Sequence, residues 1–289
     1  MAKAWTTLGL LVTGVLCFVG IILPNNARGG QLGDLRNEVR SESASATSDC
    51  DEKPKSGSSS SLSFCDDDDS DDSSWATFYF DMITAPWGIP HMLAGDEFGK
   101  AAFFPDAPYD YGPGYLAIEP LAPEQFHTWG GHFRAEYAND FDDLSRIGGR
   151  LILEHTLRVG IDAEWNYWQE NFSDGTHDQL TTGDVNFVYR FAQNEHIAMR
   201  SGIGFNWLDD RRDTNYGFNF TYGMDFFPCE PWIISADIDY GTLGARTLFH
   251  GRITAGIIFH HAEIYVGYDY YDVGEVALNG LVAGVGFWF

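Results

Sequence analysis

The sequence predicts an all-β fold: a transmembrane, antiparallel, up-and-down β-barrel of about ten strands (8 to 12) over residues 126–289. Polar and apolar residues alternate with a period of two over segments of about ten to fourteen residues, the length a tilted strand needs to cross a bilayer. Aromatic residues make up 16% of the chain, and most of them lie after Trp75 together with most of the 32 glycines. This combination favours sheet over helix.

The segment 157–170 shows the alternation best. The odd positions from Leu157 to Tyr167 are apolar, whereas the even positions from Arg158 to Asn166 are charged, amide-bearing or glycine. Residues 216–226 and 249–259 repeat the pattern, which a helix would spread over both faces. Strands are therefore predicted near residues 126–139, 145–154, 157–170, 179–191, 196–209, 214–227, 231–241, 247–260, 262–272 and 278–289.

The connections between these strands are of two kinds. Tight turns alternate with mostly longer polar connections, such as residues 171–178 and 209–213, and membrane barrels place short turns on one side and longer loops on the other. Tryptophans lie near strand ends, as interfacial girdles require, whereas a soluble β-sandwich would centre them. The tight turns are His155-Thr156, Gln193-Asn194, Cys229-Glu230 and His260-His261, and the tryptophans are Trp129, Trp165, Trp207 and Trp232.

The front of the chain predicts export followed by a spacer. Lys3 precedes an apolar run from Trp5 to Leu23, so residues 1–27 are predicted to be a signal peptide, with an uncleaved membrane anchor as the alternative. Residues 28–74 are rich in Ser, Asp and Glu and include the acidic run Asp66–Asp69. Such a segment buries too little apolar area to offset its ordering entropy, which predicts a disordered linker.

Four cysteines and a proline-rich stretch complete this front part. Cys17 lies in the leader, Cys50 and Cys65 can form a disulfide, bind a metal or stay free, and Cys229 is interpreted as a turn residue. Residues 75–125 are predicted to be an ordered lead-in, either periplasmic or a plug, because their prolines break ladders. Trp75 to Phe80 nevertheless has the pattern of a strand, so two extra strands are the alternative.

The end of the chain carries a short motif. Gly284-Val285-Gly286-Phe287-Trp288-Phe289 resembles the C-terminal insertion signal of bacterial outer-membrane β-barrel proteins: a glycine, two residues, an aromatic, any residue and a final phenylalanine. Gly284, Phe287 and Phe289 match it, whereas Ala283 stands where that family usually has a polar residue. The resemblance covers the barrel region and implies an outer-membrane location and insertion by a barrel-assembly machinery.

The turn at His260-His261 sets a register for the inward-facing residues. It places Arg252 opposite Asp269 and His250 opposite Tyr271, and the preceding hairpin can place Asp237 beside Arg252 and Asp239 beside His250. We expect Arg252, Asp237 and Asp269 to form a salt-bridge cluster in the lumen. The lumen is also expected to be filled by its own side chains, including Arg134, Arg150, Arg190, Arg200, Glu136, Glu154 and Asp225.

These features predict an integral outer-membrane barrel with a structural or passive permeation role and outer-membrane lipid as its surroundings. A formal charge of -25 argues against nucleic acid as a partner. The alternatives are a protease or hydrolase of the omptin kind, for which Asp239 with His250 would supply half of a catalytic set, and a membrane anchor or adhesin. The sequence shows no catalytic motif, and neither a cofactor nor a metal is expected.

Overall fold

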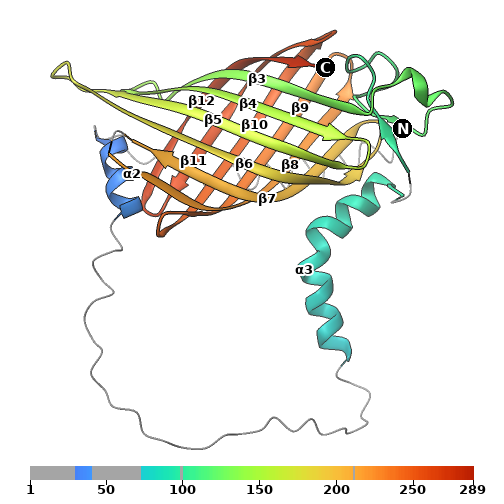
Figure 1. The fold of residues 1–289 in the computed structure, drawn as a ribbon, viewed down its shortest axis with the longest axis horizontal. Coiled ribbons are helices and arrows are strands. Elements are labelled where there is room, and N and C mark those ends of the chain that lie inside the picture. The colour runs from blue at the N-terminus through green and yellow to red at the C-terminus, as the bar shows by residue number, and fades with distance from the viewer. Residues whose placement is uncertain (1–29, 41–72, 98–99, 211) are drawn as a thin grey trace, which may run out of the picture.

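Ten antiparallel strands form one closed barrel (Figure 1) in the computed structural model, which describes residues 30–40, 73–97, 100–210 and 212–289. Each strand pairs with its sequence neighbours, and the first barrel strand pairs with the last. The predicted fold class is confirmed, and the predicted strands agree with the observed ones to within a few residues. The barrel strands are β3 (Trp129–Asn139), β4 (Leu144–His155), β5 (Val159–Asn171), β6 (His177–Gln193), β7 (Ile197–Asp209), β8 (Thr214–Cys229), β9 (Trp232–Leu243), β10 (Arg246–Phe259), β11 (Ala262–Val273) and β12 (Val276–Trp288).

The barrel is apolar outside and polar inside. On β5, Ile161 and Trp165 are 49% and 47% exposed, whereas Asp162 and Glu164 between them are only 2% and 5% exposed. This arrangement reverses that of a soluble protein and is the one that a lipid-embedded barrel requires. The outer belt includes Phe133, Ile147, Phe187, Ile203, Phe205, Phe218, Ile238, Ile264, Val266, Leu281 and Val285.

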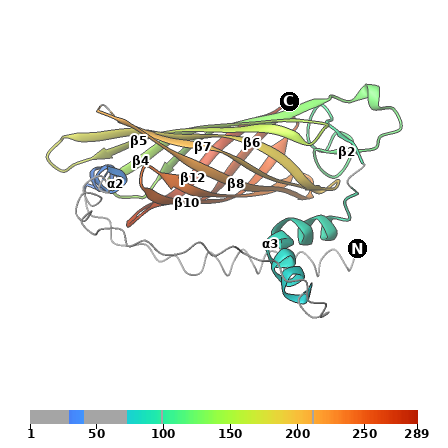
Figure 2. The same cartoon turned by 60° about the horizontal axis from the view of Figure 1, so that its bottom comes forward.

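Helix α2 (Gln31–Arg40) lies in the barrel mouth opposite the C-terminus (Figures 1 and 2). Leu32, Leu35 and Val39 occupy one face of the helix and are almost fully buried in an apolar layer with side chains of the strands. The prediction of a disordered linker over residues 28–74 is therefore wrong for residues 31–40, because these three side chains bury enough apolar surface to order one short helix.

Two tight turns of the barrel are shaped to receive this helix. Gly244 and Gly274 connect β9 to β10 and β11 to β12 with φ values of 59° and 64°, in the left-handed region that favours glycine. A Cβ at Gly244 would lie 2.7 Å from the carbonyl oxygen of Val39, and one at Gly274 would lie 2.5 Å from the Glu38 carboxylate. Both turns therefore need glycine for backbone conformation and for the close approach of α2.

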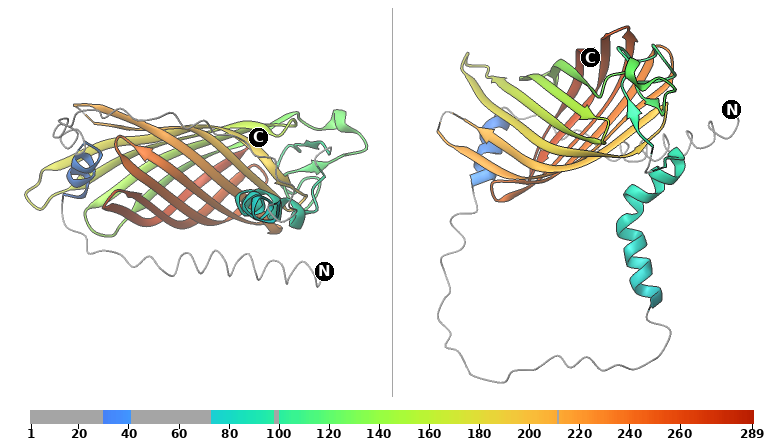
Figure 3. Two further views of the ribbon diagram at one scale, coloured as in Figure 1. Left: turned by 90° about the horizontal axis from the view of Figure 1, so that it is seen from below. Right: turned by 45° about the vertical axis from the view of Figure 1, so that its right-hand side comes forward.

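Helix α3 (Ser73–Ala94) contacts the outer wall of the barrel near the end that holds the C-terminus (Figure 3). The Trp87 indole N–H donates to the Ser201 hydroxyl at 2.8 Å, and the Tyr222 hydroxyl donates to the Pro86 carbonyl at 2.9 Å. The predicted strand at Trp75–Phe80 is wrong: these residues belong to α3, and because β3 pairs with β12 the closed barrel has no free edge for another strand. None of the helices among the described residues is long and apolar enough to cross a membrane.

The rest of the lead-in covers the mouth beside the C-terminus. Strands β1 (Ala102–Phe103) and β2 (Ala117–Ile118) pair with each other outside the barrel, followed by the 3₁₀ helix η2 (Pro123–Gln125). Cys229 ends β8 and is free and exposed. The predicted signal peptide at residues 1–27, residues 41–72 of the predicted linker, and Cys17, Cys50 and Cys65 lie outside the described residues.

Candidate functional site

The middle of the lumen holds charged side chains that reach across the barrel. Arg252 on β10 contacts Asp269 on the neighbouring β11 at 2.8 Å and Glu164 on β5, across the lumen, at 2.6 Å. Arg146 contacts Glu136 at 2.7 Å. We call this group, with its histidine, the central cluster, whose members are all buried: Glu136, Arg146, Glu164, Asp239, His250, Arg252 and Asp269.

The structure brings only part of the predicted salt-bridge cluster together. The register is as predicted, with Arg252 opposite both Asp269 and Asp237, and all three side chains are buried in the lumen. Asp237, however, contacts Arg150 at 2.6 Å and Arg200 at 3.4 Å instead of Arg252. The three-residue cluster is corrected accordingly: the long guanidinium side chain of Arg252 contacts Asp269 beside it and reaches Glu164 across the lumen, and Asp237 pairs with other arginines.

His250 lies between two carboxylates. Its Nδ1 is 3.1 Å from Asp239 and its Nε2 is 2.9 Å from Asp269. A carboxylate oxygen accepts hydrogen bonds, so both ring nitrogens donate and the ring is an imidazolium. The predicted pairing of Asp239 with His250 is present, but neither ring nitrogen has a lone pair left to accept a proton from a substrate.

Further charge pairs fill the lumen between the central cluster and the end that holds the C-terminus. All of the arginines and acids expected to fill the barrel are buried, and all except Glu136 of the central cluster lie in this part of the lumen. Each guanidinium meets at least one carboxylate, which offsets the cost of burying both charges. These pairs include Arg134–Glu263 at 2.8 Å, Arg150–Asp162 at 2.6 Å, Arg200–Asp225 at 2.6 Å and Arg190–Glu154 at 3.2 Å.

Helix α2 is held in its mouth by hydrogen bonds to its first turn. The Glu170 carboxylate at the end of β5 accepts hydrogen bonds from the backbone N–H groups of Gly30, Gln31 and Leu32 at 2.6, 2.9 and 3.0 Å. These N–H groups have no partner within the helix, and a carboxylate at this position also complements the helix dipole. Glu170 therefore acts as a cap supplied by the barrel.

Ion pairs hold the other side of α2. Arg36 contacts Asp178 at 2.7 Å and Asp210 at 2.7 Å, and Arg40 contacts Asp210 at 3.0 Å. Hydrogen bonding to the Asp178 carboxylate raises the pKa of Arg36. Burial alone would raise the pKa of Asp210, but hydrogen bonds from the backbone N–H groups of Arg212 and Asp213 and from Arg40 lower it below its ordinary value, so both partners stay charged.

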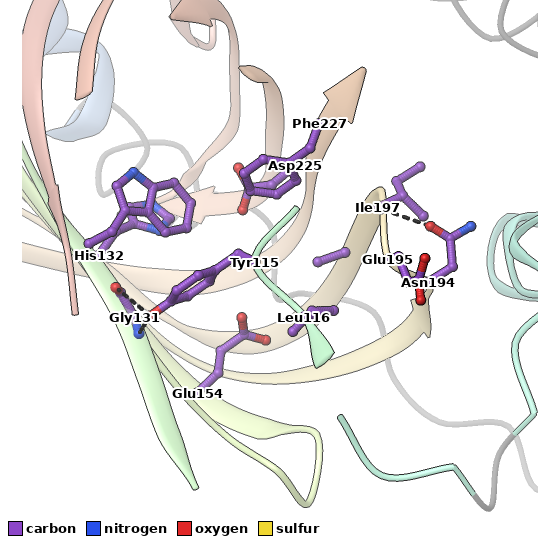
Figure 4. Close-up of a pocket in the computed structure, with 12 residues that line it drawn as sticks. Tyr115, Leu116, Gly131, His132, Glu154, Asn194, Glu195, Ile197, Asp225 and Phe227 are labelled. Atoms are coloured by element: carbon purple, nitrogen blue, oxygen red, sulfur yellow. Dashed lines mark hydrogen bonds between the residues drawn. The ribbon is translucent and has the colours of Figure 1, made fainter. Parts of the chain in front are cut away.

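The opposite mouth is closed by Tyr115, which points to the first residues of β3 (Figure 4). Its hydroxyl donates to the Phe289 carbonyl at 2.5 Å and accepts from the Gly131 N–H at 3.2 Å. Arg158 is tied to Asp96 at 2.5 Å. Three cavities in and at the ends of the lumen each measure about 10 Å³, space for roughly one water molecule.

The final motif places its aromatic residues on the lipid side. Phe287 and Phe289 are 52% and 42% exposed, and Trp288 between them is buried in the lumen. Gly284 faces the Tyr265 ring, where a Cβ would approach to 2.5 Å. The glycine of the motif therefore provides room for an aromatic side chain of β11.

Sequence reasoning missed α2 and its partners. The signal was present as Leu32, Leu35 and Val39, which share one face of a helix, with Asp34 in the first turn and Arg40 in the last. It was obscured because the composition was judged over the whole stretch of residues 28–74.

No protein-family model matches the chain, and a search of curated proteins found no match. Among solved structures, the chain is similar to the outer membrane protein Ail of Yersinia pestis, with 14% identity, 55% of this chain and 99% of that chain covered, and a TM-score of 0.32. It is also similar to the β domain of the Bordetella autotransporter BrkA (9% identity, 56% and 97% covered, TM-score 0.29). The KdgM porin is a third similar structure (11% identity, 55% and 99% covered, TM-score 0.25).

The class of this protein follows from its own geometry. A closed antiparallel barrel of ten strands, with an apolar belt outside and charged side chains inside, is the architecture of bacterial outer-membrane barrels. The chain is an integral outer-membrane β-barrel protein with a salt-bridged lumen.

Proposed function

We propose that this protein is a closed, structural barrel that anchors its N-terminal segments in the outer membrane, and that it is not an open pore. The observation that carries the proposal is the filled lumen. Guanidinium and carboxylate groups meet across the barrel, as Arg252 and Glu164 do at 2.6 Å, and three cavities among them have space for about one water molecule each. Helix α2 and Tyr115 cover the two mouths.

The outer surface of the barrel indicates the partners of this protein. Outer-membrane lipid surrounds the apolar belt, and the aromatic end at Phe287 and Phe289 is the segment that an assembly machinery would recognise. A catalytic role is not part of the proposal, because His250 donates from both ring nitrogens to Asp239 and Asp269 beneath a covered mouth. A general base needs a free lone pair within reach of a substrate.

Planar-bilayer conductance of the refolded full chain tests the proposal. We expect no steady conductance from a barrel whose folding is verified by heat-modifiable migration on gels. The second measurement uses Leu35→Asp, which places a charge in the apolar layer under α2. Silence in both proteins supports a structural barrel.

Two outcomes would favour passive permeation, the second candidate. Steady conductance by the unmodified chain would overturn the proposal directly. Conductance by Leu35→Asp but not by the unmodified chain would show that α2 plugs a permeable barrel. The position of α2 in the mouth is the observation that favours this alternative.

A further inference from the structure

One of the lumen cavities lies directly beneath the apolar layer formed with α2. Leu248 and Tyr271 belong to that layer and also line the cavity. The cavity measures about 10 Å³, which suits one water molecule or one ion. Its polar lining comes from Glu164, Asn166, Thr182, Asp184, Asn206, Asn219, Asp239 and His250.

Some of the side-chain oxygen atoms that line the cavity accept no hydrogen bond. The side-chain oxygens of Asn206 and Asn219 have no hydrogen-bond partner, although the two residues are only 3% and 1% exposed. Leaving such an oxygen buried and unpaired costs about 1–3 kcal/mol, so an occupant that coordinates it is favoured. The amide nitrogen of Asn219 is already used, because it donates to Asn186 at 3.1 Å and to Asp239 at 3.3 Å.

Two carboxylates complete the oxygen set. Asp239 meets His250 at 3.1 Å, whereas no Lys, Arg or His of the described chain lies within ion-pair distance of Asp184. One oxygen of Asp184 accepts a hydrogen bond from the Asn186 amide at 2.6 Å, and Asn186 in turn accepts from Asn219. Asp184 is therefore joined to the central cluster by amides only, with no compensating positive charge.

The local charge is out of balance. The central cluster contains four carboxylates against Arg146, Arg252 and the imidazolium of His250, and Asp184 adds a fifth carboxylate. With Asp184 ionised, two negative charges of this group remain uncompensated in a region screened from solvent, where an unpaired charge is costly.

We propose that this cavity binds one hard cation, for which Ca²⁺ has the matching charge and ligand preference. Asp184 and Asp239 supply carboxylate oxygens and Asn206 and Asn219 supply amide oxygens, the ligand types that Ca²⁺ takes. The described residues contain no group of three or more His, Cys, Asp and Glu side chains placed to hold a metal ion, so the two amides are an essential part of the site. The ion neutralises the excess charge, and the α2 layer seals it in.

Terbium luminescence tests the proposal, because Tb³⁺ replaces Ca²⁺ and emits when a nearby aromatic residue is excited. Tyr271 lines the cavity, and the Trp168 indole donates to its Thr182 hydroxyl at 2.9 Å. The refolded full chain, stripped with EDTA, should show saturable emission with TbCl₃ that CaCl₂ displaces. Asp184→Asn should weaken Tb³⁺ binding by about tenfold or more, because ligand charge sets affinity in oxygen sites.

Matched variants separate this cavity from other acids. Asp174→Asn, on the exposed loop between β5 and β6, and a chain with Asp66–Asp69 changed to asparagine should both bind Tb³⁺ as the unmodified chain does. Asp184→Ser serves in place of Asp184→Asn if the latter does not reach the heat-modifiable folded form. Unsaturable emission from the folded barrel, or full binding by a folded Asp184 variant, would overturn the proposal and leave protons and water as the occupants.

Discussion

Truncating Leu35 should release α2 from the barrel while leaving the barrel folded. Leu35 is fully buried in the apolar layer at the mouth, together with Leu32 and Val39. A buried Leu→Ala change costs about 2–5 kcal/mol, which is on the order of 30-fold or more in the docking equilibrium. A helix of ten residues has little stability of its own in water, so a loss of this size should undock it.

Limited trypsin digestion of the refolded protein measures the change. Arg36 and Arg40 are ordinary trypsin sites that become accessible only when α2 leaves the mouth, so Leu35→Ala should be cut there faster by a factor comparable to the loss in docking. Asn37→Ala, on the exposed face of the same helix, is the matched control. If Leu35→Ala is protected as well as the unmodified chain while both run as folded barrels on gels, the apolar layer does not hold the helix.

Three further predictions concern the lumen, the mouth and the last strand. Arg252→Met leaves carboxylates of the central cluster unpaired and should lower the free energy of unfolding in urea by about 3–5 kcal/mol, whereas Arg212→Met on a loop should change it by less than about 0.5 kcal/mol; equal losses would contradict the reasoning. The lowered pKa of Asp210 makes its contribution to α2 docking complete above pH 3.8, and this contribution is lost as pH falls through the lower folded value, so pepsin should cut α2 faster in that range. Asp210→Asn should weaken this dependence without abolishing it, because the hydrogen bond from Arg36 also lowers the pKa of Asp178; an unchanged dependence in Asp210→Asn would contradict the reasoning. Gly284→Val should cost about 1–3 kcal/mol by pressing on the aromatic ring of β11, and a loss no larger than that of lipid-facing Ala283→Val would refute it.

The strands and their register were predictable because both are set by local features. Period-two alternation fixes which face of a strand meets lipid, and a tight turn fixes which residues oppose each other. The turn at His260-His261 therefore placed Arg252 opposite Asp269 correctly from the sequence.

The pairing inside the lumen was not predictable in the same way. Arg252 lies directly beside Asp237 on the neighbouring strand, but its guanidinium goes to Glu164, a residue 88 positions away in sequence. Which carboxylates it meets depends on how the closed barrel brings β5 and β10 to opposite walls and on which acids other arginines have already paired. The choice of partner is therefore set by the whole network of charges, and it cannot be read from the register of two neighbouring strands.

The N-terminal part departed from prediction for a different reason. An aromatic run such as Trp75–Phe80 has the composition of a strand, but a strand needs an edge, and closure of β3 on β12 leaves none. The three apolar residues of α2 gain their burial from the barrel mouth, so their effect on folding appears only once the ten strands are in place.

A filled lumen also explains why the interior is so rich in arginine. A pore wall needs charges that point along the wall and stay hydrated, whereas here guanidinium groups extend to the opposite wall and share carboxylates between them, as Arg150 and Arg200 share Asp237. Arg150 and Arg252 thereby join strands on opposite walls of the barrel, in a protein whose outer surface meets lipid and supplies no hydrophobic force to hold its strands together. Asp184, directly below the layer that α2 closes, is a carboxylate that this cross-linking leaves without an ion-pair partner among the described residues. A cation there would complete the network that holds the barrel closed.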